Sequence, residues 1–207
     1  VSGVVKHLSA VERMPETIVV SILDMSYMPT VYTNGSTFWP MKQLSDDDPD
    51  LFTRHLKEEL FPYVQAKYRT NDFRMIMGLS PTSAYTFHTF VKEPDLFNAH
   101  IAIAAGDFLG MGYKAGERFI DLIANEVKSS PDKRRRLYVT SADADCGETS
   151  GEIKNNLEEL DSVLAPFQGE NFRSISKIFP NEGHYDVALP ALLEALDLIF
   201  PKDDWSA

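Results

Sequence analysis

The chain has 207 residues, 43% of them hydrophobic and 25% charged, and 20 basic against 31 acidic residues give a net charge of −11. This length supports one hydrophobic core, so we expect a single domain over residues 1–207, and an aromatic content of 11% excludes a disordered chain. No apolar run reaches the length of about 18 residues that indicates a membrane-spanning helix. The acidic charge disfavours a nucleic-acid partner, because such binding depends on Lys and Arg contacts with phosphates.

Short apolar runs alternate along the chain with amphipathic stretches. Residues 17–23 are rich in β-branched side chains, which predicts a buried strand, and a long loop with turn residues such as Asn34-Gly35 follows over 25–50. This alternation continues to the end of the chain and predicts an α/β fold, a mostly parallel sheet with helices on both faces. The further predicted strands are 73–79, 99–105, 137–140 and 172–179, and the predicted helices are 51–68, 82–92, 115–128, 151–164 and 186–200.

The composition of two further segments predicts whether their side chains are buried or exposed to solvent. In the helix over 51–68, apolar residues recur every fourth position and form one buried face. The apolar face of this helix consists of Phe52, Leu56, Leu60 and Val64.

The only basic cluster, residues 133–136, precedes a strand. In a chain this acidic we expect a solvated turn there rather than a phosphate site.

Polar residues with catalytic potential follow three of the predicted strands. Ser80 comes after the strand at 73–79, several acids lie between 143 and 148 after the strand at 137–140, and His184 follows the last strand. Ligands of open α/β sheets bind outside the carboxyl ends of the strands. The order Ser, acid, His is that of an α/β-hydrolase triad, in which His takes the proton of the Ser nucleophile and the acid orients the imidazole.

Each of these residues also has an ordinary structural interpretation. A serine after a strand most often caps a helix, a histidine before the last helix most often belongs to a loop, and acids after a strand most often form a solvated turn. Their occurrence together, in triad order and at strand ends, favours the catalytic interpretation. The other histidines have no metal-binding spacing, so we expect neither a metal nor another cofactor. These are His7, His55, His88 and His100.

Several motifs resemble those of esterases of the enterochelin (ferric enterobactin) esterase type, α/β-hydrolases that cleave ester bonds in siderophores and other acyl compounds. The resemblance covers residues 15–200 and implies that Ser80 is the nucleophile and His184 the base. The acid falls within 143–148, where Asp145 fits the family's Gly-x-x-acid pattern with Ala142 in the place of Gly, while Asp143 and Glu148 stay open. The matching stretches are PETIVV at 15–20, LFPYV at 60–64, YRT at 68–70, GLS at 78–80, PDLFNA at 94–99 and EGH at 182–184.

The chain departs from the family pattern in two places. Thr82 replaces the second Gly of G-x-S-x-G, and Pro81 lacks the N–H that normally donates to the oxyanion after the nucleophile. The family also has further strands and a second oxyanion donor before the position of Val19. We therefore expect the biological chain to begin before Val1, unless the protein lacks these elements.

Two functions follow as expectations. The first is a serine esterase that cleaves a small-molecule carboxylic ester through an acyl-enzyme at Ser80, with siderophore-like esters among the substrates that the resemblance implies. The alternative is an esterase-like fold without catalysis, which binds a ligand, because Pro81 removes the usual oxyanion donor. Self-association into a homo-oligomer stays open. Cys146, the single cysteine, excludes an internal disulfide, which fits the cytoplasm and equally a periplasmic protein without disulfides.

Overall fold

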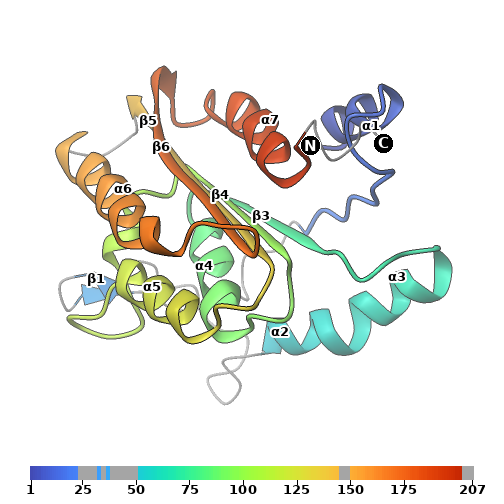
Figure 1. The fold of residues 1–207 in the computed structure, drawn as a ribbon, viewed down its shortest axis with the longest axis horizontal. Helices are drawn as coiled ribbons and strands as arrows, with labels where there is room; N and C mark the ends of the chain where they lie inside the picture. The colour runs from blue at the N-terminus through green and yellow to red at the C-terminus, as the bar shows by residue number, and fades with distance from the viewer. Residues whose placement is uncertain (23–31, 34–35, 38–50, 145–149, 202–207) are drawn as a thin grey trace.

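A four-stranded parallel sheet lies at the centre of the computed structural model, which describes residues 1–22, 32–33, 36–37, 51–144 and 150–201 (Figure 1). Its strands lie in the order β3-β4-β5-β6, and each neighbouring pair runs parallel. A separate antiparallel pair, β1 (Tyr32–Thr33) and β2 (Ser36–Thr37), lies on either side of Asn34-Gly35, a dipeptide typical of hairpins. The sheet strands are β3 (Met75–Leu79), β4 (Ala99–Ile103), β5 (Arg135–Ala144) and β6 (Phe172–Gly183).

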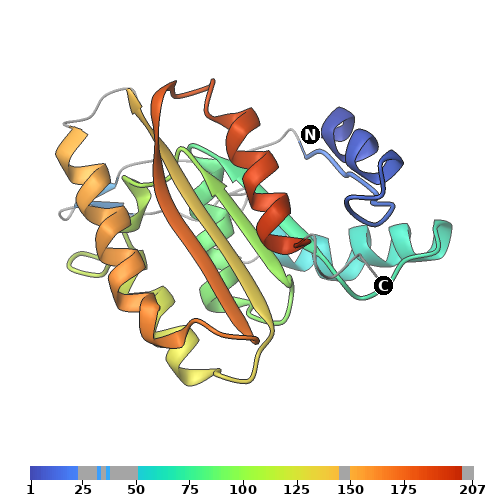
Figure 2. The same cartoon turned by 45° about the horizontal axis from the view of Figure 1, so that its top comes forward.

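Helices cover both faces of this sheet (Figure 1, Figure 2). On one face α4, α5 and α6 pack around strand residues such as Ala102 and Val139, and on the other α7 and α1 pack around Ile101 and Tyr138. The predicted α/β fold, a mostly parallel sheet between two helical layers, is thereby confirmed. None of the described helices is both long and apolar enough to cross a membrane. The helices are α1 (Ser2–Ala10), α4 (Thr82–Lys92), α5 (Phe119–Ser129), α6 (Ser150–Leu164) and α7 (Ala188–Ile199), with short 3₁₀ turns at Phe108–Gly110 and Ala165–Phe167.

The helical stretch predicted over 51–68 is present as three consecutive pieces. They are α2 (Leu51–His55), a single π turn (Leu56–Leu60) and α3 (Phe61–Lys67). Phe52 and Leu56 are buried in a small core with Tyr85 of α4, and Leu60 packs against it. Three of the four residues of the predicted apolar face therefore attach this stretch to the rest of the protein, whereas the fourth, Val64, is half-buried and is not part of this core.

The prediction for the basic cluster was wrong for two of its four residues. Arg135 and Arg136 begin β5, and Arg135 is only 2% exposed. Its guanidinium pairs with Glu126 at 3.1 Å and lies 4.7 Å from the centre of the Phe90 ring. The guanidinium of Arg136 donates to the carbonyl oxygens of Asn171 and Glu170. Buried charges are stable only with such partners, which a sequence pattern does not reveal.

The strand predicted over 17–23 is also wrong within its described part, residues 17–22. These residues form no helix or strand, and Ile18, Val20 and Ile22 are 44%, 48% and 47% exposed. Val19, which lies between the outward side chains, packs against the core on the α7 side. A β-branched run needs a paired neighbour to become a strand, and within the described residues no backbone hydrogen bond joins this segment to the sheet.

His100 is a fully buried histidine on β4. Its ring packs edge-on against Phe90 and Phe97, with centroids 5.0 and 6.0 Å apart, and within the described residues neither ring nitrogen has a hydrogen-bond partner. Burial, and to a smaller extent the positive charge of Arg135, lower the pKa of His100 to about 3. The imidazole is therefore neutral throughout the range in which an exposed histidine titrates.

Replacement of His100 by Leu is expected to change how stability depends on pH. The pKa of His100 in the folded protein, about 3, lies below its unfolded value of 6.5, so the unfolded state takes up the proton first as pH falls. This lowers the free energy of unfolding of the wild type between pH 6.5 and pH 3 by up to about 1.4 kcal/mol per pH unit, and His100→Leu lacks this loss. Urea unfolding from pH 7 to pH 4 measures the difference. Parallel profiles for the two proteins would contradict the prediction, and the exposed His7→Gln serves as the control.

Candidate active site

Ser80 occupies a tight turn between β3 and α4. Its backbone φ is +55°, a left-handed conformation that a residue with a side chain rarely adopts. The Ser80 N–H donates to the carbonyl of Ile103 in β4 at 2.8 Å, and the Ser80 carbonyl accepts the N–H of Ser83 at 2.8 Å. Both backbone groups are thus held, one by the sheet and one by the first turn of the helix, and this explains how the strained conformation is maintained.

Gly78 allows the helix to approach the strand at this turn. A Cβ at Gly78 would lie 2.4 Å from the carbonyl oxygen of Thr82 and 2.7 Å from the nitrogen of Ser83. Both of these are backbone atoms, which cannot move aside as a flexible side chain can. The glycine at this position is therefore required by close packing, as in a strand–turn–helix nucleophile elbow.

The hydroxyl of Thr82 completes the turn. It accepts the N–H of Leu79 at 2.6 Å and donates to the carbonyl of Leu79 at 2.8 Å. Leu79 is the last residue of β3, an edge strand of the sheet, so this hydroxyl satisfies the two backbone groups of Leu79. The sequence interpretation treated Thr82 only as a replacement of the second Gly of the motif and missed this role. A threonine three residues after the end of a strand is the signal that could have indicated it.

The N–H groups that follow Ser80 are mostly occupied. Pro81 has none, and those of Ser83 and Ala84 donate to the carbonyls of Ser80 and Pro81 at 2.8 and 3.2 Å. Among residues 81–84, and within the described part of the chain, the N–H of Thr82 is the one that has no acceptor.

Ser80, His184 and the start of the acidic segment lie along the same edge of the sheet, whereas the rest of the acidic segment lies outside the described residues. Ser80 follows β3, the acidic segment begins at the end of β5, and His184 follows β6, and in parallel strands these carboxyl ends share an edge (Figure 1). Neighbouring strands are about 4.8 Å apart, so β3 and β6 are separated by roughly 14 Å. The ladder between β5 and β6 extends five residues past Val139, the last residue of β5 that pairs with β4. The segment that carries His184 therefore starts beyond the end of β4.

Asp143 and the segment before His184 are in direct contact. The Oδ2 atom of Asp143 accepts the backbone N–H of Asn181 at 2.9 Å. His184 itself is partly buried, and the ring of Tyr185, which is 76% exposed, stands edge-on to it at 4.9 Å between centroids. Of the predicted site, the structure thus brings together the start of the acidic segment and the histidine segment.

Two of the three candidate acids, Asp145 and Glu148, lie outside the described residues. Asp143 is therefore the candidate acid that the structure places, and it is exposed. Within the described ranges, no group of three or more His, Cys, Asp or Glu side chains is arranged to hold a metal ion.

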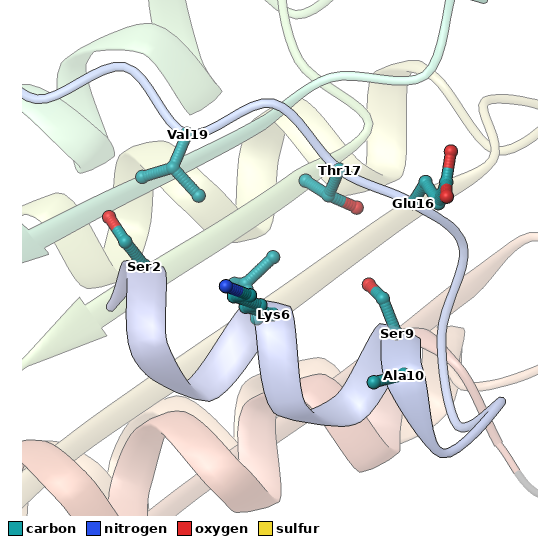
Figure 3. Close-up of a pocket in the computed structure, with 8 residues that line it drawn as sticks. Ser2, Lys6, Ser9, Ala10, Glu16, Thr17 and Val19 are labelled. Atoms are coloured by element: carbon teal, nitrogen blue, oxygen red, sulfur yellow. The ribbon is translucent and has the colours of Figure 1, made fainter.

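A groove of about 540 Å³ lies elsewhere, between α1 and the extended segment that follows it (Figure 3). Figure 3 shows Ser2, Lys6 and Ser9 along the helix, with Ser2 opposite Val19 and Ser9 opposite Thr17 and Glu16 of the extended segment. The hydroxyls of Ser9 and Thr17 both donate to the carbonyl of Pro15 at 2.9 Å, which fixes the turn between the two walls. None of the predicted site residues lines this groove.

The arrangement of the sheet and the strained serine turn define an α/β-hydrolase fold. Solved structures with this fold include an IroE-like serine hydrolase from Shewanella oneidensis, with a TM-score of 0.73 and 19% identity over 96% of this chain and 65% of that chain. The BES protein from Bacillus cereus gives a TM-score of 0.62 and 13% identity over 84% of this chain and 64% of that one. The siderophore hydrolase EstA from Aspergillus nidulans gives a TM-score of 0.57 and 15% identity over 76% of this chain and 57% of that one.

These likenesses confirm the predicted fold class. They also confirm that the fold resembles that of enterochelin esterases, as the sequence motifs imply. At these identities they show the fold and not the activity. The chain spans somewhat less than two thirds of the length of these three proteins. No family model matches the chain, and no curated protein matches it by sequence.

Proposed function

We propose that the protein is a serine esterase that hydrolyses small-molecule carboxylic esters through an acyl-enzyme at Ser80. The observation that carries the proposal is the turn between β3 and α4, in which Ser80 has a φ of +55° and Gly78 leaves no room for a side chain. A helix cap does not need this strain, whereas a nucleophile raised above the edge of a sheet does. The fold also resembles those of an IroE-like serine hydrolase and a siderophore hydrolase. In α/β-hydrolases, a strand–turn–helix of this kind carries the nucleophile.

In the proposed reaction, the Oγ of Ser80 attacks the ester carbonyl carbon while His184 takes the hydroxyl proton. The carbon–oxygen bond to the leaving group then breaks, and His184 returns the proton to the departing alkoxide. Water attacks the acyl-enzyme by the same route and releases the acid and Ser80. Asp145 is the proposed acid that orients the imidazole. The negative charge on the carbonyl oxygen needs a donor other than Pro81, and we assign this role to the N–H of Thr82.

A fluorophosphonate probe tests the nucleophile directly, because it phosphonylates activated serines. We expect one adduct per chain, located at Ser80 by peptide mass spectrometry and absent from Ser80→Ala. His184→Gln should slow labelling by at least about 100-fold, since a general base contributes roughly 10²–10⁴ to such a step. Labelling that persists in Ser80→Ala, or equal labelling rates in wild type and His184→Gln, would contradict the assignment.

Pro81 favours a second candidate, an esterase-like protein that binds an ester or a related ligand without cleaving it. The loss of one oxyanion donor lowers hydrolase rates by about 10²–10³. This candidate predicts no labelling of Ser80 at any pH, which separates it from the first.

For the substrate class of the esterase, the likeness to EstA, a siderophore hydrolase, makes siderophore-like esters the first compounds to compare with simple aryl esters.

A further inference from the structure

β6 contains a bulge immediately before the histidine segment. Ala142 pairs with Phe179, and the next recorded pair is Ala144 with Gly183. Between these pairs β5 has one residue, Asp143, whereas β6 has three, residues 180–182. Such irregularities occur beside active sites, where they change the direction in which the following side chains leave the sheet. Here the residue that follows the last pair is His184.

The side chain of Asp143 supports this bulge. Its Oδ2 accepts the N–H of Asn181, the central residue of the three, at 2.9 Å. Asn181 has a φ of +62°, a conformation that costs an asparagine less than most residues but still needs external support. The Asp143 carboxylate provides a hydrogen bond that the interrupted ladder leaves unmade at this point.

The segment after the bulge is fixed at its other end by the beginning of α7. The carbonyl of Gly183 accepts the N–H of Val187 at 3.1 Å, and that of Tyr185 accepts the N–H of Ala188 at 3.3 Å. Val187 is fully buried against the core. His184 is thus held between a fixed turn on one side and the bulge on the other. Within the described residues, the exposed carboxylate of Asp143 is the side chain that hydrogen-bonds to the backbone of this bulge.

We infer that Asp143 is a positioning residue for His184: it holds the bulge of β6 by accepting the N–H of Asn181, and in this way sets where the imidazole stands. This inference rests on the proposed esterase function. It also distinguishes Asp143 from the acid of the triad, because accepting a backbone N–H requires an oxygen atom and not a negative charge. The acid that orients the imidazole is then a different residue, for which Asp145 is the first candidate and Glu148 the alternative.

Two substitutions of the same residue separate these roles. Asparagine retains an acceptor oxygen and loses the charge, whereas alanine loses both. We expect Asp143→Asn to hydrolyse p-nitrophenyl acetate with a kcat within about threefold of wild type. We expect Asp143→Ala to lower kcat about 10- to 100-fold at similar KM, because small misplacements of a catalytic group have effects of this size. Glu182→Ala, which removes another acid from the same bulge, is the matched control and should behave like wild type.

Amide hydrogen exchange provides a readout that does not need activity. In peptides covering residues 179–185, exchange at Asn181 should be faster in Asp143→Ala than in wild type and unchanged in Asp143→Asn. If exchange in Asp143→Ala equals that of wild type, the inference is overturned. If Asp143→Asn keeps wild-type exchange but loses activity like Asp143→Ala, the carboxylate acts through its charge, and the inference is overturned in favour of a triad acid.

The exchange result is independent of the proposed function. A wild type that is inactive and not labelled by the fluorophosphonate overturns the esterase proposal, while faster exchange in Asp143→Ala still supports the bulge contact. Thermal unfolding of each variant identifies any global loss of structure. If Asp143→Ala does not fold, Asp143→Asn, whose side chain has the same shape as that of the wild type, still tests the inference.

Discussion

Ser80→Ala is expected to lower kcat/KM for p-nitrophenyl acetate about 10³-fold or more. Removal of the serine from a complete triad costs about 10⁶ in rate. Pro81 removes the usual oxyanion donor, and if the Thr82 N–H replaced none of its effect, the wild-type rate would be lower by about 10²–10³. The rate difference between wild type and Ser80→Ala would then still be about 10³–10⁴. The variant should keep the wild-type free energy of unfolding or gain slightly in thermal stability, since Ser80 contributes strain rather than packing.

The control for this experiment is a serine outside the site. Ser129 lies at the exposed end of α5, and its hydroxyl donates to the carbonyl of Glu126. Ser129→Ala should retain the wild-type rate, and this also corrects for slow, non-specific hydrolysis by surface side chains. Equal rates in wild type, Ser80→Ala and Ser129→Ala would refute the esterase proposal and support the non-catalytic alternative.

Gly78→Ala is expected to damage both stability and the site. The new Cβ would lie 2.4 Å from the Thr82 carbonyl oxygen, about 1 Å closer than ordinary contact, so α4 must move away from β3. We expect the free energy of unfolding to fall by about 1–3 kcal/mol, the usual range for overpacking. Fluorophosphonate labelling of Ser80 should slow at the same time, because the turn that holds φ at +55° depends on this approach.

Gly169→Ala is the matched control, since a Cβ at that exposed glycine meets no atom within 4 Å. Urea unfolding of both variants, with labelling rates measured under native conditions, gives the comparison. A Gly78→Ala protein with wild-type stability and wild-type labelling would show that the helix and strand are less tightly coupled than the structure indicates. Thr82→Val adds a second test of the same turn, because it keeps the volume but removes the hydroxyl bonded to Leu79.

Much of the fold was predictable from local pattern. The helix at Thr82–Lys92 and the strand at Ala99–Ile103 coincide with apolar runs of helical and strand character, and both were predicted almost to the residue. β5 was predicted too short because its ends carry Arg135 and Ser141, polar residues that are buried only because specific partners satisfy them. α1 was not predicted, because its nine residues include a glycine and two valines, which have low helix propensity, and no side chain caps its start.

The candidate site was predictable in part. Ser80 and His184 were selected from their place after strands, and the structure puts both at the carboxyl edge of the sheet. The contact between Asp143 and Asn181 was not predictable, because it depends on the register of two strands and joins residues 38 positions apart in the chain. The Pro-Asn dipeptide at 180–181 was the only local sign of a left-handed residue there.

The half-exposed segment at residues 17–22 has a practical consequence for handling the protein. Its sequence, TIVVSI, combines high β-propensity with a complete lack of charge, and three of its apolar side chains point to solvent. Segments of this kind promote intermolecular strand pairing and precipitation at high concentration. The net charge of −11 opposes such aggregation through repulsion between molecules. Colloidal stability should therefore decline as salt is raised or as the pH approaches the isoelectric point near 4.9.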